Sequence, residues 1–444
     1  MNADGGRPGP RYRKLQPWPG SSGKEVAEHQ RGRIHAATIE LVDEGGYEDL
    51  TVTGIARAAG VSNRTFYENF GGKDDCFLAT YDLIVRHTAR EVLGAMHGER
   101  DHRAKLRAGF LALAREVAEK PSAARLVLIE AFAAPAAFER MRHTNGLFEA
   151  LVAESFTVDG QAGPPTLVVK GIVAGVTRVA RARLLAGEER RLPDEVDALM
   201  EWALALVCPE AREVCPGSVR AATDVRTRAA PNAREPLAVV TDQLLGDERT
   251  MILAAAARLA ANDGYAELSV PRIRAAAGVS RRRFEQHFEG VTDCLLAALE
   301  LLAGRVFAKA KRAYCRAGAW PHGIHRVVAT ICREIADDPV LVRLAFFELY
   351  APGRRTVRWR ADLIAVLGCF LNASAPSEKP AGLAGEASVG AAWAALHHYA
   401  TTGRAEQLPR VAGTVSYLLL APAVGGEEAA EVIRAEEQEA VLTP

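Results

Sequence analysis

The stretch LTVTGIARAAGVSNRTFYENF, residues 50–70, decides the fold of this chain. Its first part predicts a short helix, because apolar residues recur on one side at helical spacing: Ile55, Ala56 and Ala59. Gly60 gives the backbone the freedom for a tight turn, and Ser62 is a good cap for a following helix. That second helix turns Phe66 and Phe70 toward the core, since they are four residues apart. Two short helices joined by a tight turn are therefore expected.

The face of the second helix that lies opposite its phenylalanines is polar. It carries Asn63, Arg64, Thr65, Tyr67, Glu68 and Asn69. A polar helix face held rigidly beside a partner helix is how a helix-turn-helix presents side chains to the edges of DNA bases. The pattern thus indicates a DNA-reading unit.

The same pattern returns at residues 268–288, which read LSVPRIRAAAGVSRRRFEQHF. Tyr47 and Tyr265 stand 218 residues apart (265 − 47 = 218), and this offset aligns residues well outside the two stretches. The aligned pairs include Ile34 with Ile252, Leu41 with Leu259, Pro121 with Pro339, Arg125 with Arg343 and Glu130 with Glu348. Matches spread so widely predict duplication of a whole unit, and two copies suggest one protein fused to its own partner. We expect Arg125 and Glu130, like Arg343 and Glu348, to pair at the surface rather than to form a buried ion pair or to face a ligand.

Composition and charge set broad limits. The chain has 444 residues, of which 49% are hydrophobic and 25% charged, as in ordinary globular proteins of several domains. Its 55 basic and 55 acidic residues cancel, which by itself argues against a nucleic-acid binder. The charge is segregated, however: residues 1–35 hold seven basic and three acidic residues, and residues 427–439 hold six Glu and one Arg. Local fields can therefore still attract phosphate.

Motifs of other functions are missing from the sequence. No apolar run of about 18 residues and no secretory signal occurs, so we expect no membrane span and a cytoplasmic location. The seven Cys form no CxxC pair, which favours reduced thiols in the core. There is no Walker loop, zinc-ligand spacing or nucleophile elbow, so no cofactor, no metal and no catalytic residue is predicted. Trp202, His397 and His398 are expected in the core or in a pocket wall.

Helical periodicity extends beyond the first DNA-reading unit. Residues 166–185, TLVVKGIVAGVTRVARARLL, carry Gly171 and Gly175, whose small size predicts a close interface with another helix. The predicted domains are a disordered basic arm (1–24), a first DNA-binding domain (25–75), a first helical regulatory domain (76–208), a linker (209–245), a second DNA-binding domain (246–293), a second helical regulatory domain (294–424) and an acidic tail (425–444). The arm either lies along DNA or is a solvated tail.

Residues 50–73 follow the pattern L-T-V-x-x-I-A-x-x-A-G-V-S-x-x-T-F-Y-x-x-F-x-x-K, and here the chain resembles the TetR family of bacterial transcriptional regulators. The second half keeps the pattern more loosely. The resemblance implies an all-α fold of two tandem TetR-like units, each with a three-helix DNA-binding domain and a C-terminal helical domain for ligand binding and dimerisation. Because family chains have about half this length and act as dimers, it also implies an intramolecular pseudo-dimer. A homodimer of the whole chain with four heads is the rival assembly.

The resemblance also implies which residues contact DNA. Phosphates would be contacted by Thr51, Thr53, Tyr67 and Lys73, and base edges by Asn63, Arg64 and Thr65, with Ser62 beside them. Arg can bond guanine bidentately and Asn can bond adenine, whereas Thr, Tyr and Lys position the helix on phosphates. The candidate residues of the second head are Ser269, Ser280, Arg281, Arg282, Arg283 and His287.

The second head departs from the family pattern. Glu285 replaces Tyr67 and should repel phosphate, and Val291 replaces Lys73, which removes a phosphate contact. The core positions survive as Ile273, Val279, Phe284 and Phe288. The second head therefore either reads a different, G-rich half-site or has drifted toward non-specific binding.

We expect a ligand-responsive transcriptional repressor that binds double-stranded operator DNA with two half-sites. Its small-molecule effector is implied by the resemblance alone, and no ligand-binding residue is assigned. Two alternatives stay open: a helical small-molecule-binding protein or enzyme with vestigial heads, and a regulator in which only the first head reads DNA.

Overall fold

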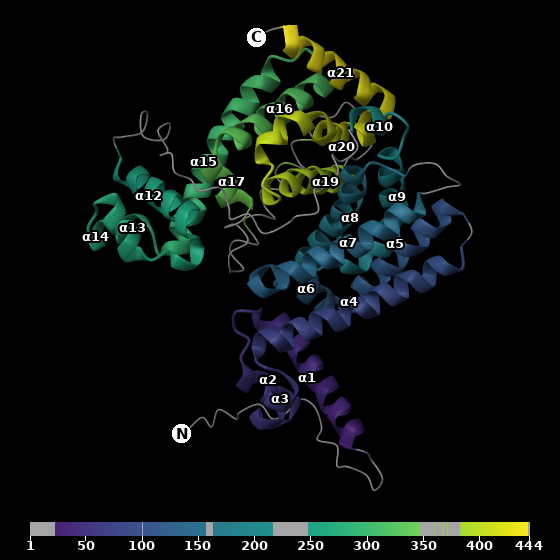
Figure 1. Ribbon diagram of the computed structural model, residues 1–444, viewed down its shortest axis with the longest axis vertical. Helices are drawn as coiled ribbons and strands as arrows, with labels where there is room; N and C mark the ends of the chain where they lie inside the picture. Colours follow the sequence, from purple (N-terminus) through teal and green to yellow (C-terminus); the bar gives the residue numbers. More distant parts are fainter. Residues whose placement is uncertain are drawn as a thin grey trace. The chain divides into compact units, whose positions relative to one another are not determined.

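The computed structural model describes residues 23–99, 101–156, 163–215, 247–346 and 382–442, together with Trp359, Leu367 and Leu371. Every regular element in these ranges is a helix, which confirms the all-α fold (Figure 1). Most of the predicted arm and linker lies outside the described residues. Contacts divide the chain into two compact units, the first made mainly of residues up to Phe148 with Ala180–Val196, and the second of Glu149–Val179 and the chain from Asp197 onward.

The first unit begins with the predicted helix-turn-helix. Its elements are α1 (Gly23–Gly45), α2 (Val52–Ala59), α3 (Asn63–Asn69) and α4 (Lys73–His97), followed by α5 (His102–Glu119) and α6 (Pro121–Leu128). The residues of the apolar pattern form one core, among them Ile34, Leu50, Ile55, Ala59, Phe66, Phe70 and Phe77. This core holds α2 and α3 against α1 and α4, as the spacing of the apolar residues predicted.

The second copy of this arrangement lies in the second unit. The helices α12 (Glu248–Asp263), α13 (Val270–Ala277), α14 (Arg281–His287), α15 (Val291–Cys315), α16 (Trp320–Asp337) and α17 (Pro339–Phe346) repeat α1 to α6. From α2 to α6, each helix starts and ends 218 residues before its counterpart (270 − 52 = 218). The offset found in the sequence is thus also the offset of the helices, and the tandem duplication is confirmed.

A second offset relates the C-terminal parts of the two halves. After η1 (Glu130–Ala133), η2 (Pro135–Ala137) and α7 (Phe138–Ser155), the first half continues with α8 (Thr166–Ala186), the 3-10 helix η3 (Glu189–Glu195) and α9 (Val196–Ala205). The second half has α19 (Gly382–Thr401), η6 (Ala405–Val411) and α20 (Ala412–Val424). Each pair starts 216 residues apart (382 − 166 = 216). Gly187 and Gly403, both at φ 70°, mark the same turn in the two halves.

Within the second unit, α8 approaches α19 closely at the two glycines singled out in the sequence. A β-carbon on Gly171 would lie 3.1 Å from Cβ of Ala391, and one on Gly175 would lie 2.8 Å from the carbonyl oxygen of Ala387. The predicted close helix interface is therefore confirmed. Trp202 of α9 is 2% exposed, so it belongs to the helical core as expected.

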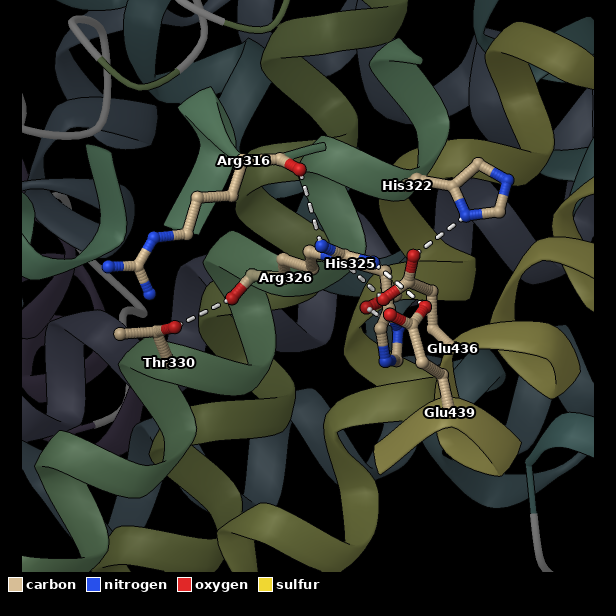
Figure 2. A network of polar contacts seen from close by, with 8 residues as sticks. Arg316, His322, His325, Arg326, Thr330, Glu436 and Glu439 are labelled. Atoms are coloured by element: carbon tan, nitrogen blue, oxygen red, sulfur yellow. Dashed lines mark hydrogen bonds and ion pairs between the residues drawn. The ribbon is translucent and has the colours of Figure 1, made fainter. Parts of the chain in front are cut away.

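The segment predicted as an acidic tail is a packed helix. It forms α21 (Gly426–Leu442), which packs on α16 and α20 through its small and branched residues: Ala429, Ala430, Val432 and Ile433. Its Glu436 is only 7% exposed, accepts from Arg326 Nε at 2.7 Å and lies 2.8 Å from His322 Nδ1 (Figure 2). The predicted linker also starts later than expected, because α10 (Ala211–Val214) packs on α20 and α21.

Candidate nucleic-acid interface

Side-chain caps hold the two helices of the first head at their N-terminal ends. Thr51 Oγ1 accepts from the backbone N–H of Gly54 at 3.1 Å, and Ser62 Oγ accepts from the N–H of Thr65 at 3.0 Å. Gly60 ends α2 in the left-handed region at φ 64°, which residues other than glycine rarely adopt. The predicted roles of Gly60 in the turn and Ser62 as a cap are confirmed, and both fix the start of α3.

Packing sets the orientation of α3. This helix has only seven residues and would not be stable alone. Its Phe66 is 0% and Phe70 is 2% exposed. His35 of α1 meets the Phe70 ring edge-on at a centroid distance of 5.3 Å, and the Arg31 guanidinium lies 4.9 Å from the same ring centre. The opposite side of α3 is thereby turned away from the core.

The residues predicted to face DNA in the first head are mostly exposed. The exposed ones are Thr51, Thr53, Ser62, Asn63, Arg64 and Tyr67. Among the large hydrophobic side chains of the described residues, Tyr67 is the most exposed, at 60%. Thr65 is half-buried, and its hydroxyl lies 2.9 Å from Ser62 Oγ, so it is less accessible than we expected.

Lys73 is held in place at the start of α4. Its Nζ lies 4.6 Å from the centroid of the Tyr47 ring, and the Tyr47 hydroxyl donates to Asp74 Oδ1 at 2.7 Å. Burial, helped by the Asp74 carboxylate, raises the pKa of Tyr47, so the ring stays neutral. A cation–π contact with a neutral ring therefore positions the Lys73 ammonium.

Glu68, a carboxylate that is not among the predicted DNA contacts, shares the exposed face of α3. Arg64 Nε donates to Glu68 Oε1 at 3.0 Å, and the two side chains are 89% and 57% exposed. An exposed pair one helical turn apart contributes only about 0.3–0.5 kcal/mol. Arg64 can therefore exchange this partner for a base edge at little cost.

The second head has the same backbone but different side chains. Gly278 ends α13 at φ 69°, and Ser280 Oγ accepts from the N–H of Arg283 at 3.3 Å, as in the first head. Ser269 is half-buried and its side chain makes no capping bond, unlike Thr51. Of the two predicted site serines of this head, Ser280 therefore caps its helix through its side chain and Ser269 does not.

Carboxylates pair with most of the basic residues of α14. Arg281 Nε donates to Glu285 Oε1 at 2.6 Å. Glu248 of α12 lies 3.4 Å from the Arg283 guanidinium and 3.7 Å from His287 Nε2. Arg282 is exposed. The i, i+4 spacing of Arg281 and Glu285 could have revealed the first pair, but Glu248 is far along the chain and its role could not be read from a local pattern.

A buried carboxylate connects the first head to the helices that follow it. Glu130 is 7% exposed and accepts from the backbone N–H of Tyr47 at 3.0 Å. The prediction of a surface Arg125–Glu130 pair is wrong, because Glu130 is buried and Arg125 lies 3.4 Å from Asp43 of α1. The second-half counterpart, Glu348, lies outside the described residues.

Further features of the described residues concern metal binding and membrane crossing. Among those residues, no group of three or more His, Cys, Asp or Glu could hold a metal ion. No single helix there is long and apolar enough to cross a membrane, and one bent pair, Pro121–Ala133 with Pro135–Ser155, passes that test of length and composition. The described cysteines are free, and Cys315 is exposed rather than in the core. His398 is half-buried, and burial lowers its pKa to about 4.

Two regions of the chain match the family described as bacterial regulatory proteins, tetR family: residues 34–80 and 252–298. The uncharacterized HTH-type transcriptional regulator YvdT of Bacillus subtilis (strain 168) is 30% identical over 69 residues, which cover 16% of this chain and 36% of YvdT. HbdR of Aromatoleum sp. (strain CIB), an HTH-type transcriptional regulator, is 34% identical over 77 residues, covering 16% of this chain and 34% of HbdR. The uncharacterized regulator Rv1556 of Mycobacterium tuberculosis is 34% identical over 108 residues, covering 24% of this chain and 51% of Rv1556. The chain thus spans between a third and half of the length of these relatives.

Two solved structures align with part of the chain. The transcriptional regulator FadR from Bacillus subtilis, in complex with stearoyl-CoA, aligns with 40% of this chain over 99% of its own, at 14% identity and a TM-score of 0.36. A TetR family transcription regulator from Marinobacter aquaeolei VT8 aligns with 41% of this chain over 98% of its own, at 20% identity and a TM-score of 0.35.

Proposed function

We propose that this chain is a tandem helix-turn-helix transcriptional regulator of the tetR family and that it binds DNA as a single-chain pseudo-dimer. The two halves would take the places that two identical chains take in an ordinary dimer. We also propose that it is a repressor relieved by a small molecule and that it acts in the cytoplasm, without enzymatic activity. These last parts rest on the family alone.

The pairing of α8 with α19 is the observation that carries the pseudo-dimer. In the 216-residue register, Gly171 corresponds to Ala387 and Gly175 to Ala391 (391 − 175 = 216). The contacts Gly171–Ala391 and Gly175–Ala387 are therefore the same contact with the two halves exchanged. Such reciprocity is the defining property of a two-fold symmetric interface.

A third contact supports a pseudo-two-fold axis at this point. Ala174 and Gly390 are equivalent in the same register (390 − 174 = 216), and a β-carbon on Gly390 would lie 3.2 Å from the carbonyl oxygen of Ala174. Equivalent residues meet each other only near a two-fold axis. The axis would therefore pass between the middles of α8 and α19.

Two heads related in this way would enter successive major grooves, roughly 34–36 Å apart. The first head would read bases with Asn63 and Arg64 and hold phosphates with Tyr67 and Lys73. The second head would read bases with Arg282 and its two neighbouring arginines, and it lacks two phosphate contacts. The proposed operator therefore has two unlike half-sites.

Genome-wide mapping of bound DNA, followed by footprinting, tests this operator. We expect one asymmetric site in which each head protects its own half, and a strictly palindromic site would contradict the proposal. Light scattering at micromolar concentration tests the assembly. A mass near that of one chain, 47.7 kDa, is expected, whereas twice that value would favour a four-headed dimer.

A second candidate is a regulator in which only the first head reads DNA. The carboxylates of Glu285 and Glu248, which pair with Arg281 and Arg283, favour it. Arg281→Ala combined with Arg282→Ala separates the two candidates. A clear loss of operator affinity supports two reading heads, and unchanged affinity supports one.

A further inference from the structure

The interface between the halves is built from residues that differ at equivalent positions. The first half supplies Gly171, Gly175, Arg178 and Trp202, and the second half has Ala387, Ala391, Ala394 and Leu418 at the same places in the 216-residue register. These residues all belong to the second compact unit. A pair of two first halves, or of two second halves, would therefore have a different interface from the one observed.

We propose that this interface selects the unlike pair: each half binds the other half and rejects a copy of itself. The inference rests on the pseudo-dimer proposed above and deepens it by naming the residues that make the pairing exclusive. Polar partners, charge and packing each contribute.

The Trp202 indole depends on the second half for its hydrogen bond. Its Nε1 donates to Ser388 Oγ at 2.9 Å, and both side chains are 2% exposed. In a pair of first halves, Ile172 would stand where Ser388 stands (388 − 172 = 216), and it offers no acceptor. In a pair of second halves, Ser388 would face Leu418 in place of Trp202. Each like pair would thus bury a polar group that has lost its partner, which is unfavourable.

Arg178 discriminates through charge. It is 5% exposed, and its guanidinium lies 3.8 Å from the Glu386 carboxylate of α19. The first half has Lys170 at the position of Glu386 (386 − 170 = 216). A second copy of the first half would therefore bring an ammonium to the site of the carboxylate, and the neighbouring Glu149 already pairs with Lys170 at 2.6 Å. A buried arginine facing a like charge disfavours that pair.

Packing excludes a pair of second halves. The two helices come so close that a β-carbon at Gly175 would lie 2.8 Å from the Ala387 carbonyl oxygen. A second copy of α19 would place Ala391 at the position of Gly175. Its β-carbon would then collide with backbone, which cannot swing aside as a long side chain can. The helices would have to separate and lose their contact.

Selective pairing has a consequence for DNA reading. Two chains could exchange halves, but each resulting pair would still contain one head of each kind. Pairs with two first heads, which would read a palindrome, would be suppressed. The interface would thereby preserve the asymmetry of the operator.

The test starts from the folded full chain. A protease site is placed within residues 216–246, the folded protein is cut there, and the halves are left to exchange at micromolar concentration before native mass spectrometry. We expect complexes of one first half with one second half, with like pairs at least about tenfold rarer. A statistical mixture of like and unlike pairs would overturn the inference.

Two substitutions of Arg178 sharpen the result. Arg178→Glu would set a carboxylate opposite Lys170 of another first half and opposite Glu386 of the second half, so pairs of first halves should become about tenfold more abundant or more. Arg178→Met keeps an unbranched, flexible side chain without the charge, and it should weaken the unlike pair without producing that increase. Glu431→Lys, at an exposed position of α21, is the control and should leave the distribution unchanged. If Arg178→Glu and Arg178→Met gave the same distribution, selection by charge would be wrong.

DNA binding is measured separately on the uncut chain. Exclusive unlike pairing without DNA binding would overturn the proposed function and leave the selective interface standing. DNA binding with a statistical mixture of pairs would overturn the selective interface alone.

Discussion

The backbone N–H of Tyr47 donates to the Glu130 carboxylate at 3.0 Å, although 83 residues separate the two along the chain. Tyr47 follows α1 in the first head, and Glu130 opens η1 behind α6. Both are less than 9% exposed. This bond fastens the head to the helices that follow it.

Glu130→Ala should destabilise the first unit, because it leaves the buried N–H of Tyr47 without its acceptor. We expect a loss of about 1–3 kcal/mol in the free energy of unfolding, measured by urea denaturation. Glu139→Ala is the matched control, since that carboxylate is 72% exposed in a pair with Arg142 and should matter by less than about 0.5 kcal/mol. Equal effects of the two substitutions would mean that the Tyr47 bond contributes nothing.

Arg64→Ala should relax the base specificity of the first head. If Arg64 bonds guanine bidentately, its loss costs about 1–3 kcal/mol at one base pair of the operator and little elsewhere. Glu68→Gln is the opposite test, because it releases Arg64 and removes a negative charge from the face near the phosphates, and it should tighten binding. Affinities for a set of single-base operator variants check both. A uniform loss over all variants would instead identify Arg64 as a phosphate contact.

Features that depend on local spacing could be predicted from the sequence, and features that depend on distant residues could not. Ser62, Gly60 and Phe66 act within one or two helical turns, so their roles as cap, turn and core follow from the pattern. Glu248 reaches Arg283 over 35 positions (283 − 248 = 35), and no periodicity records such a contact. A surface position is the expectation for Glu130 because carboxylates are usually exposed, whereas its burial depends on a backbone N–H elsewhere in the fold.

The packing of the acidic C-terminal segment could not be predicted for a related reason. Its charge predicts an acidic tail, but its apolar residues recur at helical spacing between the glutamates, and α16 supplies both Arg326 and His322 for Glu436. A local charge count contains no information about such partners. The close helix approach at the two glycines of α8 could be predicted, because it depends on the small size of the glycines themselves, whatever the partner is.

Lys73→Ala should weaken DNA binding evenly across operator sequences, because a phosphate contact carries no base information. The slope of log affinity against log salt should fall by about 0.9. Val291→Lys in the second head is the reciprocal variant and should raise the slope by about 0.9 if that head lies on DNA. An unchanged slope in Val291→Lys, beside a reduced one in Lys73→Ala, would show that only the first head contacts phosphate.

Gly175→Ala should destabilise the bundle of the second unit. The added β-carbon would come within 2.8 Å of the Ala387 carbonyl oxygen, so the helices must separate at a cost of about 1–3 kcal/mol. Gly94→Ala is the control, because nothing lies within 4 Å of a β-carbon on that exposed helical glycine. It should stabilise the protein by about 0.5–1 kcal/mol through helix propensity. Thermal melts of both variants measure these stability changes. Stabilisation by both substitutions would mean that the close approach of the two helices does not exist.

The first head should lose stability in mild acid, and the second should not. His35 is 8% exposed beside Thr80, and burial, with smaller effects of Arg31 and Arg86, lowers its pKa from 6.5 to about 4. Between pH 6.5 and about pH 4, His35 is therefore protonated in the unfolded chain and neutral in the folded head. The free energy of unfolding falls as the pH falls through this range. The loss reaches about 2 kcal/mol at pH 5 and about 3 kcal/mol when complete.

Hydrogen exchange resolves the two heads within one sample. Leu253 stands at the position of His35 in the second head (253 − 35 = 218), so the amides of α14 provide an internal control for those of α3. On going from pH 7 to pH 5, the protection of α3 relative to α14 should fall about 30-fold, which corresponds to about 2 kcal/mol. His35→Leu should abolish this relative change by giving both heads the same apolar residue. If the two heads kept the same relative protection in the unsubstituted chain, the buried imidazole would not govern the stability of the first head.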